Sequence, residues 1–168
     1  MQDLVLALTL VVCLFTDLKQ RKIYNKVIFP VLIFGIIYNI VTAGLPGLYQ
    51  SLLGMAAGLG ILIIPFALGG MGAGDVKLLA VIGAVKGPLF VLYAAIGMAL
   101  AGGILALVVL AYKGMLFQSI RIFLRGIWLM IISRFRVFQF DFGDSDKIML
   151  PYGFAIAIGA VSAYWWMG

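Results

Sequence analysis

Long apolar stretches, separated by short segments rich in charge, glycine or proline, make up most of the chain. A helix needs about 20 apolar residues to cross the ~30 Å hydrocarbon core of a membrane, so a chain of 168 residues has room for about six such helices. The sequence therefore predicts an all-α integral membrane protein with one polytopic domain over residues 1–168. The expected spans lie near residues 3–16, 27–43, 51–68, 76–86, 88–111 and 151–167.

The stretch 76–86 is short for a membrane crossing. At about 1.5 Å per residue it covers only about half of the hydrocarbon core. It ends at Lys86-Gly87-Pro88, where the glycine can stop one helix and the proline is suited to begin the next. We expect this helix to be tilted, or to lie where the membrane is locally thinner.

The positions of the twelve Lys and Arg residues predict the topology. If Met1 is outside, only Lys86 also falls outside and the other eleven lie on the cytoplasmic side, in agreement with the positive-inside rule. The same assignment requires 76–86 to cross the membrane. The basic residues placed inside are Lys19, Arg21, Lys22, Lys26, Lys77, Lys113, Arg121, Arg125, Arg134, Arg136 and Lys147.

The composition excludes a soluble fold. Hydrophobic residues make up 65% of the chain and charged residues 11%, whereas about half and about a quarter are typical of soluble domains. The net charge of +6 comes from basic residues that flank apolar stretches, which favours anionic membrane lipids over nucleic acid as partners. Neither a basic region nor a small-residue cleavage site accompanies the first stretch, so we expect a retained helix there.

Two further features limit the chemistry. With one cysteine, Cys13, and no histidine, the chain lacks the side chains for a disulfide or a structural zinc site, and we expect no metal and no other cofactor. The segment 112–149 interleaves apolar and basic residues. This pattern is typical of a basic amphipathic helix at the membrane surface, here in a cytoplasmic loop.

Two of the six acidic residues stand at the ends of apolar stretches: Asp17 closes the first and Asp75 opens the fourth. Carboxylates at such depth are costly, so we expect a functional reason for them. The predicted topology places both on the cytoplasmic side, where they could meet. Two close carboxyls share a proton near neutral pH, and such a pair can activate a water and protonate a scissile carbonyl, as in an aspartyl protease.

Each candidate residue also has a structural interpretation. Asp75 follows the glycine-rich run Gly69–Gly74 and could cap the next helix, and Asp17 could simply mark the end of a span. For Asn25, capping of the helix that follows is the favoured interpretation. Lys77 is more simply explained as an anchor to lipid headgroups.

Three motifs occur along the chain and together resemble those of the type IV prepilin peptidase family. They are Asp17 followed after five residues by Ile23-Tyr24-Asn25, then Gly72-Ala73-Gly74-Asp75-Val76-Lys77, and finally Leu150-Pro151-Tyr152-Gly153. The resemblance implies a membrane endopeptidase that removes the short basic leader of type IV pilin-like precursors at the cytoplasmic face. It implies that Asp17 and Asp75 are catalytic. The residues expected to support the substrate or the active site are Gly72, Gly74, Lys77, Asn25 and Pro151.

The chain departs from the family pattern in two respects. Tyr24 stands where the family usually has proline, which weakens the argument for a rigid turn. Many members also carry an amino-terminal domain with paired CxxC motifs and methylate the new pilin terminus, and this chain has a single cysteine. It therefore resembles the short, peptidase-only form.

Two other functions stay open at this point. A presenilin-like or signal-peptide-peptidase-like protease also uses a GxGD motif, but a Tyr-Asp pair and a later Pro-Ala-Leu would be expected, whereas here Thr16 precedes Asp17. A proton- or cation-coupled transporter also has intramembrane aspartates and broken helices. The sequence shows no convincing internal repeat of the kind that many transporters have.

Overall fold

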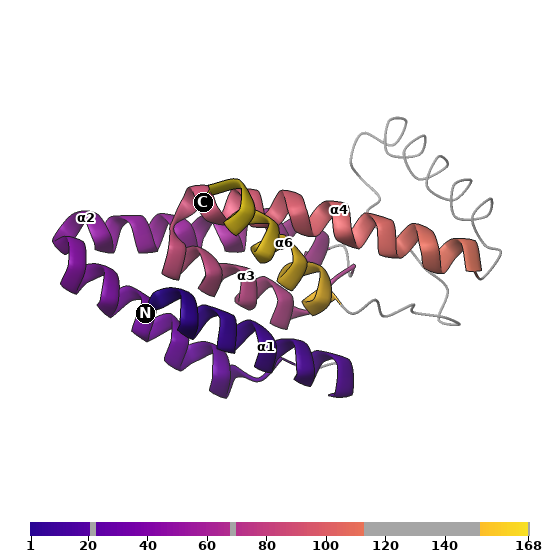
Figure 1. Ribbon diagram of the computed structural model, residues 1–168, viewed down its shortest axis with the longest axis horizontal. Helices are drawn as coiled ribbons and strands as arrows, with labels where there is room; N and C mark the ends of the chain where they lie inside the picture. Colours follow the sequence, from indigo (N-terminus) through magenta and orange to yellow (C-terminus); the bar gives the residue numbers. More distant parts are fainter. Residues whose placement is uncertain (21–22, 68–69, 113–151, 168) are drawn as a thin grey trace. The chain divides into compact units, whose positions relative to one another are not determined.

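The computed structural model describes residues 1–20, 23–67, 70–112 and 152–167, and all the regular structure in these ranges is α-helical. The all-α prediction is therefore confirmed for these ranges. The chain divides into two units, Met1–Gly102 with Pro151–Gly168, and Gly103–Leu150. In the second unit, the described residues are the last turns of α4. The helices are α1 (Gln2–Gln20), α2 (Asn25–Ala67), α3 (Ala73–Lys86), α4 (Pro88–Tyr112) and α6 (Tyr152–Met167), as Figure 1 shows.

Helix α2 consists of two arms that meet at Gly44. This residue has φ 63° and ψ −140°, a left-handed conformation that L side chains rarely adopt. Pro46 follows two residues later and has no N–H to donate to the preceding turn. The first arm runs along α3 in the same direction, because Asn25 contacts Lys77 and Asn39 contacts Val85. The stretches expected near 27–43 and 51–68 are thus joined into one kinked element.

Helix α3 lies at the centre of the first unit and contacts α1, α2 and α6 (Figure 1). Apart from Lys77, residues 75–85 are all buried. Small residues allow the second arm of α2 to approach α3 very closely: a Cβ at Gly54 would lie 1.9 Å from the carbonyl oxygen of Gly83. Because other helices cover α3, it does not need the length that contact with lipid demands. The tilt or membrane thinning expected for 76–86 stays a prediction.

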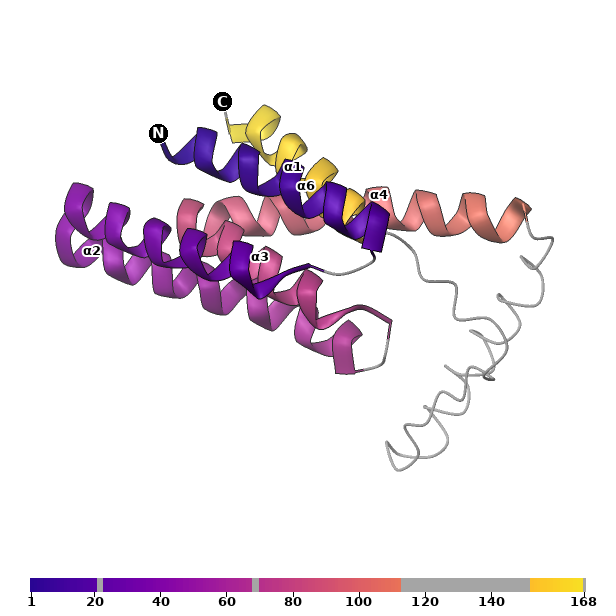
Figure 2. The same ribbon diagram turned by 90° about the horizontal axis from the view of Figure 1, so that it is seen from below.

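The contacts between helices define two ends of the first unit. Helix α1 runs opposite to α6, because Asp17 near the end of α1 meets Gly153 at the start of α6, while Asp3 meets Tyr164. It also runs opposite to α3, because Asp3 pairs with Lys86 at the end of that helix. We call the end where α1 finishes and α2, α3 and α6 begin the aspartate end. Figure 2 shows α1 and α6 side by side.

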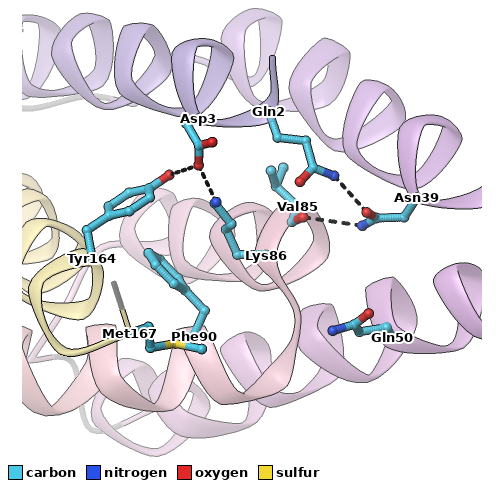
Figure 3. Close-up of a pocket in the computed structure, with 9 residues that line it drawn as sticks. All are labelled: Gln2, Asp3, Asn39, Gln50, Val85, Lys86, Phe90, Tyr164 and Met167. Atoms are coloured by element: carbon cyan, nitrogen blue, oxygen red, sulfur yellow. Dashed lines mark hydrogen bonds and ion pairs between the residues drawn. The ribbon is translucent and has the colours of Figure 1, made fainter. Parts of the chain in front are cut away.

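A polar network occupies the opposite end (Figure 3). Asp3 pairs with Lys86 and accepts a hydrogen bond of 2.7 Å from the Tyr164 hydroxyl, which joins α1, α3 and α6. The Asn39 amide donates to the Ser51 hydroxyl at 2.7 Å and to the Val85 carbonyl at 3.2 Å. Asn39 therefore ties both arms of α2 to the end of α3, and the network fixes the ends of the helices that carry the aspartates.

Two of the described helices are long and apolar enough to cross a membrane. They are α2 and residues 88–109 of α4, and only 11% and 22% of their most apolar windows are buried. Among the described residues, exposed apolar surface of this extent marks a region that contacts either lipid or another protein. Six membrane crossings stay a prediction. The expected interfacial segment in 112–149 lies outside the described residues, except for Tyr112, which is the last residue of α4.

Candidate active site

Asp17 and Asp75 line one pocket at the aspartate end. The pocket has a volume of about 360 Å³, and both carboxyl-bearing residues are largely buried, with 9% and 7% of their surfaces exposed. The structure thus brings together the two residues that the sequence singled out. The other lining residues come from the segment before α2 and from the glycine turn before α3: Ile23, Tyr24, Asn25, Gly72, Ala73 and Gly74.

Asp17 is held from another helix. Its Oδ2 accepts a buried hydrogen bond of 3.0 Å from the backbone N–H of Gly153, in the first turn of α6. The first N–H groups of a helix have no partner within that helix and carry partial positive charge, so they stabilise a nearby carboxylate. Asp17 therefore does more than mark the end of α1, because its carboxylate joins α1 to α6.

Asp75 is held by its own helix. Gly72 is the N-cap of α3, and its N–H donates a hydrogen bond of 3.2 Å to Oδ2 of Asp75. An acidic residue at the third position of a helix accepts the same bond in a capping box. Asp75 precedes the expected span 76–86. Burial, and after it the negative charge of Asp17, raises the pKa of Asp75 to about 6. A carboxyl in this range can hold or release a proton near neutral pH.

The glycines of the turn allow close approach. A Cβ at Gly74 would lie 2.9 Å from the Cβ of Ile23, so a side chain here would push the start of α2 away from the turn. A Cβ at Gly72 would lie 3.3 Å from Oδ2 of Asp75. The glycines expected to support the site therefore line it, and their lack of side chains keeps the two walls of the pocket together.

Asn25 and Lys77 form a contact at the rim. The ammonium group of Lys77 donates to Oδ1 of Asn25 at 3.0 Å, and both side chains are exposed. Asn25 is the first residue of α2, so it stands inside the helix, and its side chain binds Lys77 where a cap of that helix was expected. Asn25 lines the pocket, whereas Lys77 reaches it only through Asn25.

Gly153 is a site residue that the sequence reasoning missed. The motif Leu150-Pro151-Tyr152-Gly153 contains it, but the residue that the sequence predicts to support the site is Pro151, which lies outside the described residues. A Cβ at Gly153 would lie 2.6 Å from Oδ2 of Asp17. A glycine in the first turn of an apolar helix indicates close approach of another group, although it does not say which group approaches.

A larger cavity of about 720 Å³ lies at the opposite end, among Asp3, Asn39, Lys86 and neighbouring residues. Its polar groups bond mainly to one another, so they explain how the helices are joined rather than a reaction (Figure 3). The smaller pocket, with two buried carboxylates facing the same space, is the better candidate for chemistry. The described residues contain no group of three or more His, Cys, Asp or Glu side chains that could hold a metal ion.

Comparison with known protein families agrees with the site. A sequence model described as the type IV leader peptidase family matches residues 4–107, which include Asp17 and Asp75. The chain belongs to the type IV leader peptidase family. It is therefore a leader-peptidase-type protease of a membrane-associated family. Neither the curated proteins nor the solved structures gave a significant match.

Proposed function

We propose that the chain is an intramembrane aspartyl endopeptidase that removes the basic leader of type IV pilin-like precursors. The observation that carries this proposal is the shared pocket of Asp17 and Asp75. Two carboxyls in one buried site do not ionise together easily, so one of them keeps its proton to a higher pH than a free carboxyl does. The raised pKa of Asp75 supports this state of the pair.

Peptide hydrolysis by this mechanism requires one ionised and one protonated carboxyl. The ionised carboxylate takes a proton from a water, whose oxygen attacks the scissile carbonyl carbon, and the protonated carboxyl donates to the carbonyl oxygen. The pocket has room for an extended peptide backbone because its turn consists of glycine and alanine from Gly72 to Gly74. No step of this mechanism needs a metal or another cofactor.

We place the pocket near the cytoplasmic face of the cell membrane in a multi-pass protein. Lys19, Lys26 and Lys77 belong to the aspartate end, whereas Lys86 lies at the opposite end. This distribution supports a cytoplasmic aspartate end, because basic residues accumulate on that side and contact anionic lipids there. The substrate would be a pilin-like precursor, with its short basic leader reaching the pocket from the cytoplasm.

Co-expression with a pilin-like precursor from the same genome tests the proposal. Amino-terminal sequencing of the membrane fraction should show a shortened precursor with one new terminus, and only when the wild-type chain is present. Ion flux across vesicles that depends on Asp17 and Asp75, with every precursor left intact, would instead favour the transporter and contradict the proposal.

A further inference from the structure

The two carboxylates of the pocket receive different backbone hydrogen bonds. Oδ2 of Asp75 accepts from Gly72, three residues earlier, so this bond belongs to the cap of its own helix. Oδ2 of Asp17 accepts from Gly153, 136 residues later, and this bond is buried. The donor to Asp17 thus comes from α6, outside its own element, and depends on how α6 packs against α1.

Only glycine fits at position 153. A Cβ there would lie 2.6 Å from Oδ2 of Asp17, a distance that real Cβ atoms essentially never show, and 3.0 Å from Cγ of the same residue. Any larger residue would displace the carboxylate or break its hydrogen bond. The main chain of α6 at Gly153 therefore fixes the position of Oδ2 of Asp17.

We propose that Gly153 is a positioning residue: its N–H keeps Oδ2 of Asp17 as a hydrogen-bond acceptor, which makes Asp17 the general base and Asp75 the general acid. This inference rests on the proposed function and assigns one role to each carboxyl. Both carboxylates accept one main-chain N–H, but the bond to Asp17 is buried and measures 3.0 Å, whereas the bond to Asp75 is partly buried and measures 3.2 Å, so the donor favours the ionised form more at Asp17. The burial that raises the pKa of Asp75 agrees with a proton on that residue.

The assignment gives a balanced reaction. Asp17 takes one proton from water, the water oxygen bonds to the carbonyl carbon, and Asp75 gives its proton to the carbonyl oxygen, which yields a neutral diol. The proton on Asp17 then passes to the leaving nitrogen as the C–N bond breaks, and one diol hydroxyl returns a proton to Asp75. Both carboxyls end in the state in which they began.

The first test needs no substrate. Infrared titration of the purified protein follows the carbonyl stretch of protonated carboxyls in the wild type, Asp17→Asn and Asp75→Asn. We expect a band that titrates near pH 6 in the wild type. It should persist in Asp17→Asn, at a lower midpoint because a neighbouring charge is gone, and disappear in Asp75→Asn. Loss of the band in Asp17→Asn with an unchanged band in Asp75→Asn would overturn the assignment.

The second test uses Gly153→Ala with two matched glycine variants. In Gly60→Ala the added methyl group meets nothing within 4 Å, and in Gly159→Ala it would lie 2.2 Å from the Ala94 carbonyl oxygen, which disturbs α6 away from the pocket. We expect Gly153→Ala to lower kcat roughly 100-fold with little change in KM, as for a catalytic group displaced by about 1 Å. The acidic limb of its kcat/KM profile should move to higher pH, because the carboxylate has lost a donor.

The controls separate positioning from general damage. Gly60→Ala should match the wild type, and Gly159→Ala should lose stability without a shift of the acidic limb. A Gly153→Ala enzyme with the wild-type pH profile would overturn the proposal, whatever its kcat. If the wild type cleaves no pilin-like precursor, the proposed function fails, while the infrared titration still decides which carboxyl carries the proton. If Gly153→Ala does not fold, the same titration of the other variants tests the assignment of the two carboxyls.

Discussion

Asp75 lies in one pocket with Asp17, and burial together with the negative charge of Asp17 raises the pKa of Asp75 to about 6. The two residues come from the end of α1 and the first turn of α3, helices that run in opposite directions. Their meeting therefore depends on the packing of the first unit as a whole. The electrostatic coupling of this pair leads to several predictions.

Activity should fall as the pH rises through about 6. The pair titrates as a unit, and its reactive form holds one proton, which Asp75 releases with a pKa of about 6 in the free protein. The profile of kcat/KM against pH, which reports the free enzyme, should therefore show its basic limb near this value. A profile that rises steadily between pH 6 and 8 would contradict the assignment of the shared proton.

Asp75→Asn should stabilise the protein at neutral pH. The folded pKa of about 6 exceeds the ordinary value of 3.8, so the folded state holds a proton that the unfolded state has released between these values, and stability falls as pH rises through this window. The difference corresponds to at most about 3 kcal/mol at pH 7. Each kcal/mol is worth roughly 2–4 °C for a chain of this size.

Thermal unfolding in detergent measures this effect. The variant should melt several degrees above the wild type at pH 7.5, and the difference should vanish below about pH 3, where both the folded and the unfolded wild type are protonated at this residue. Equal melting temperatures at both pH values would mean that Asp75 is not buried as an ionisable group.

Gly74→Ala should lower cleavage, and a change at Ile23 should restore it. The added methyl group would lie 2.9 Å from the Cβ of Ile23, so Ile23→Ala retains the clash and Ile23→Gly removes it. We expect a roughly tenfold or greater loss of kcat in Gly74→Ala, because small displacements of catalytic groups are costly. Steady-state kinetics of the two double variants measures the rescue, which should appear only with Ile23→Gly. Equal activity of the two double variants would contradict the predicted contact.

Cysteine labelling tests the predicted topology. The single native cysteine, Cys13, is 1% exposed and should give little background. Gln50 lies at the end of the unit opposite to the aspartates, and Lys19 lies at the aspartate end; both side chains are exposed. An impermeant maleimide should label Gln50→Cys in intact cells, and Lys19→Cys only after permeabilisation. The reverse pattern would place the aspartate pocket outside.

The sequence predicted the helical class and the two aspartates for clear physical reasons. Apolar stretches with few charges indicate helices, and carboxylates at the ends of such stretches are costly enough to indicate candidate functional residues. Asp17 and Asp75 were expected on one face from charge counting alone, and the structure places them in one pocket. The resemblance to the family favours the proposed aspartyl-protease chemistry over the other functions of paired acids.

The hydrophobic pattern of the sequence does not predict how the helices are arranged. In a lipid environment the surfaces that face lipid and those that face protein are both apolar, so hydrophobicity does not tell which helices are neighbours. The central position of α3 depends on close backbone contact at Gly54 and Gly83, and glycine spacing alone does not name the partner. Asn39, half-buried in an apolar arm of α2, and Gly153 act through distant partners for the same reason.

Cleavage of a pilin-like precursor by Asp17→Asn, Asp75→Asn and the double variant tests the central claim most directly. Asp3→Asn is the matched control, because Asp3 lies on the same helix as Asp17 but outside the pocket. We predict that each pocket variant lowers kcat by at least ~10³-fold, that the double variant is no worse than either, and that Asp3→Asn still cleaves, because the pair acts as a unit. Full cleavage by either pocket variant, in protein that is inserted and folded, would contradict the account.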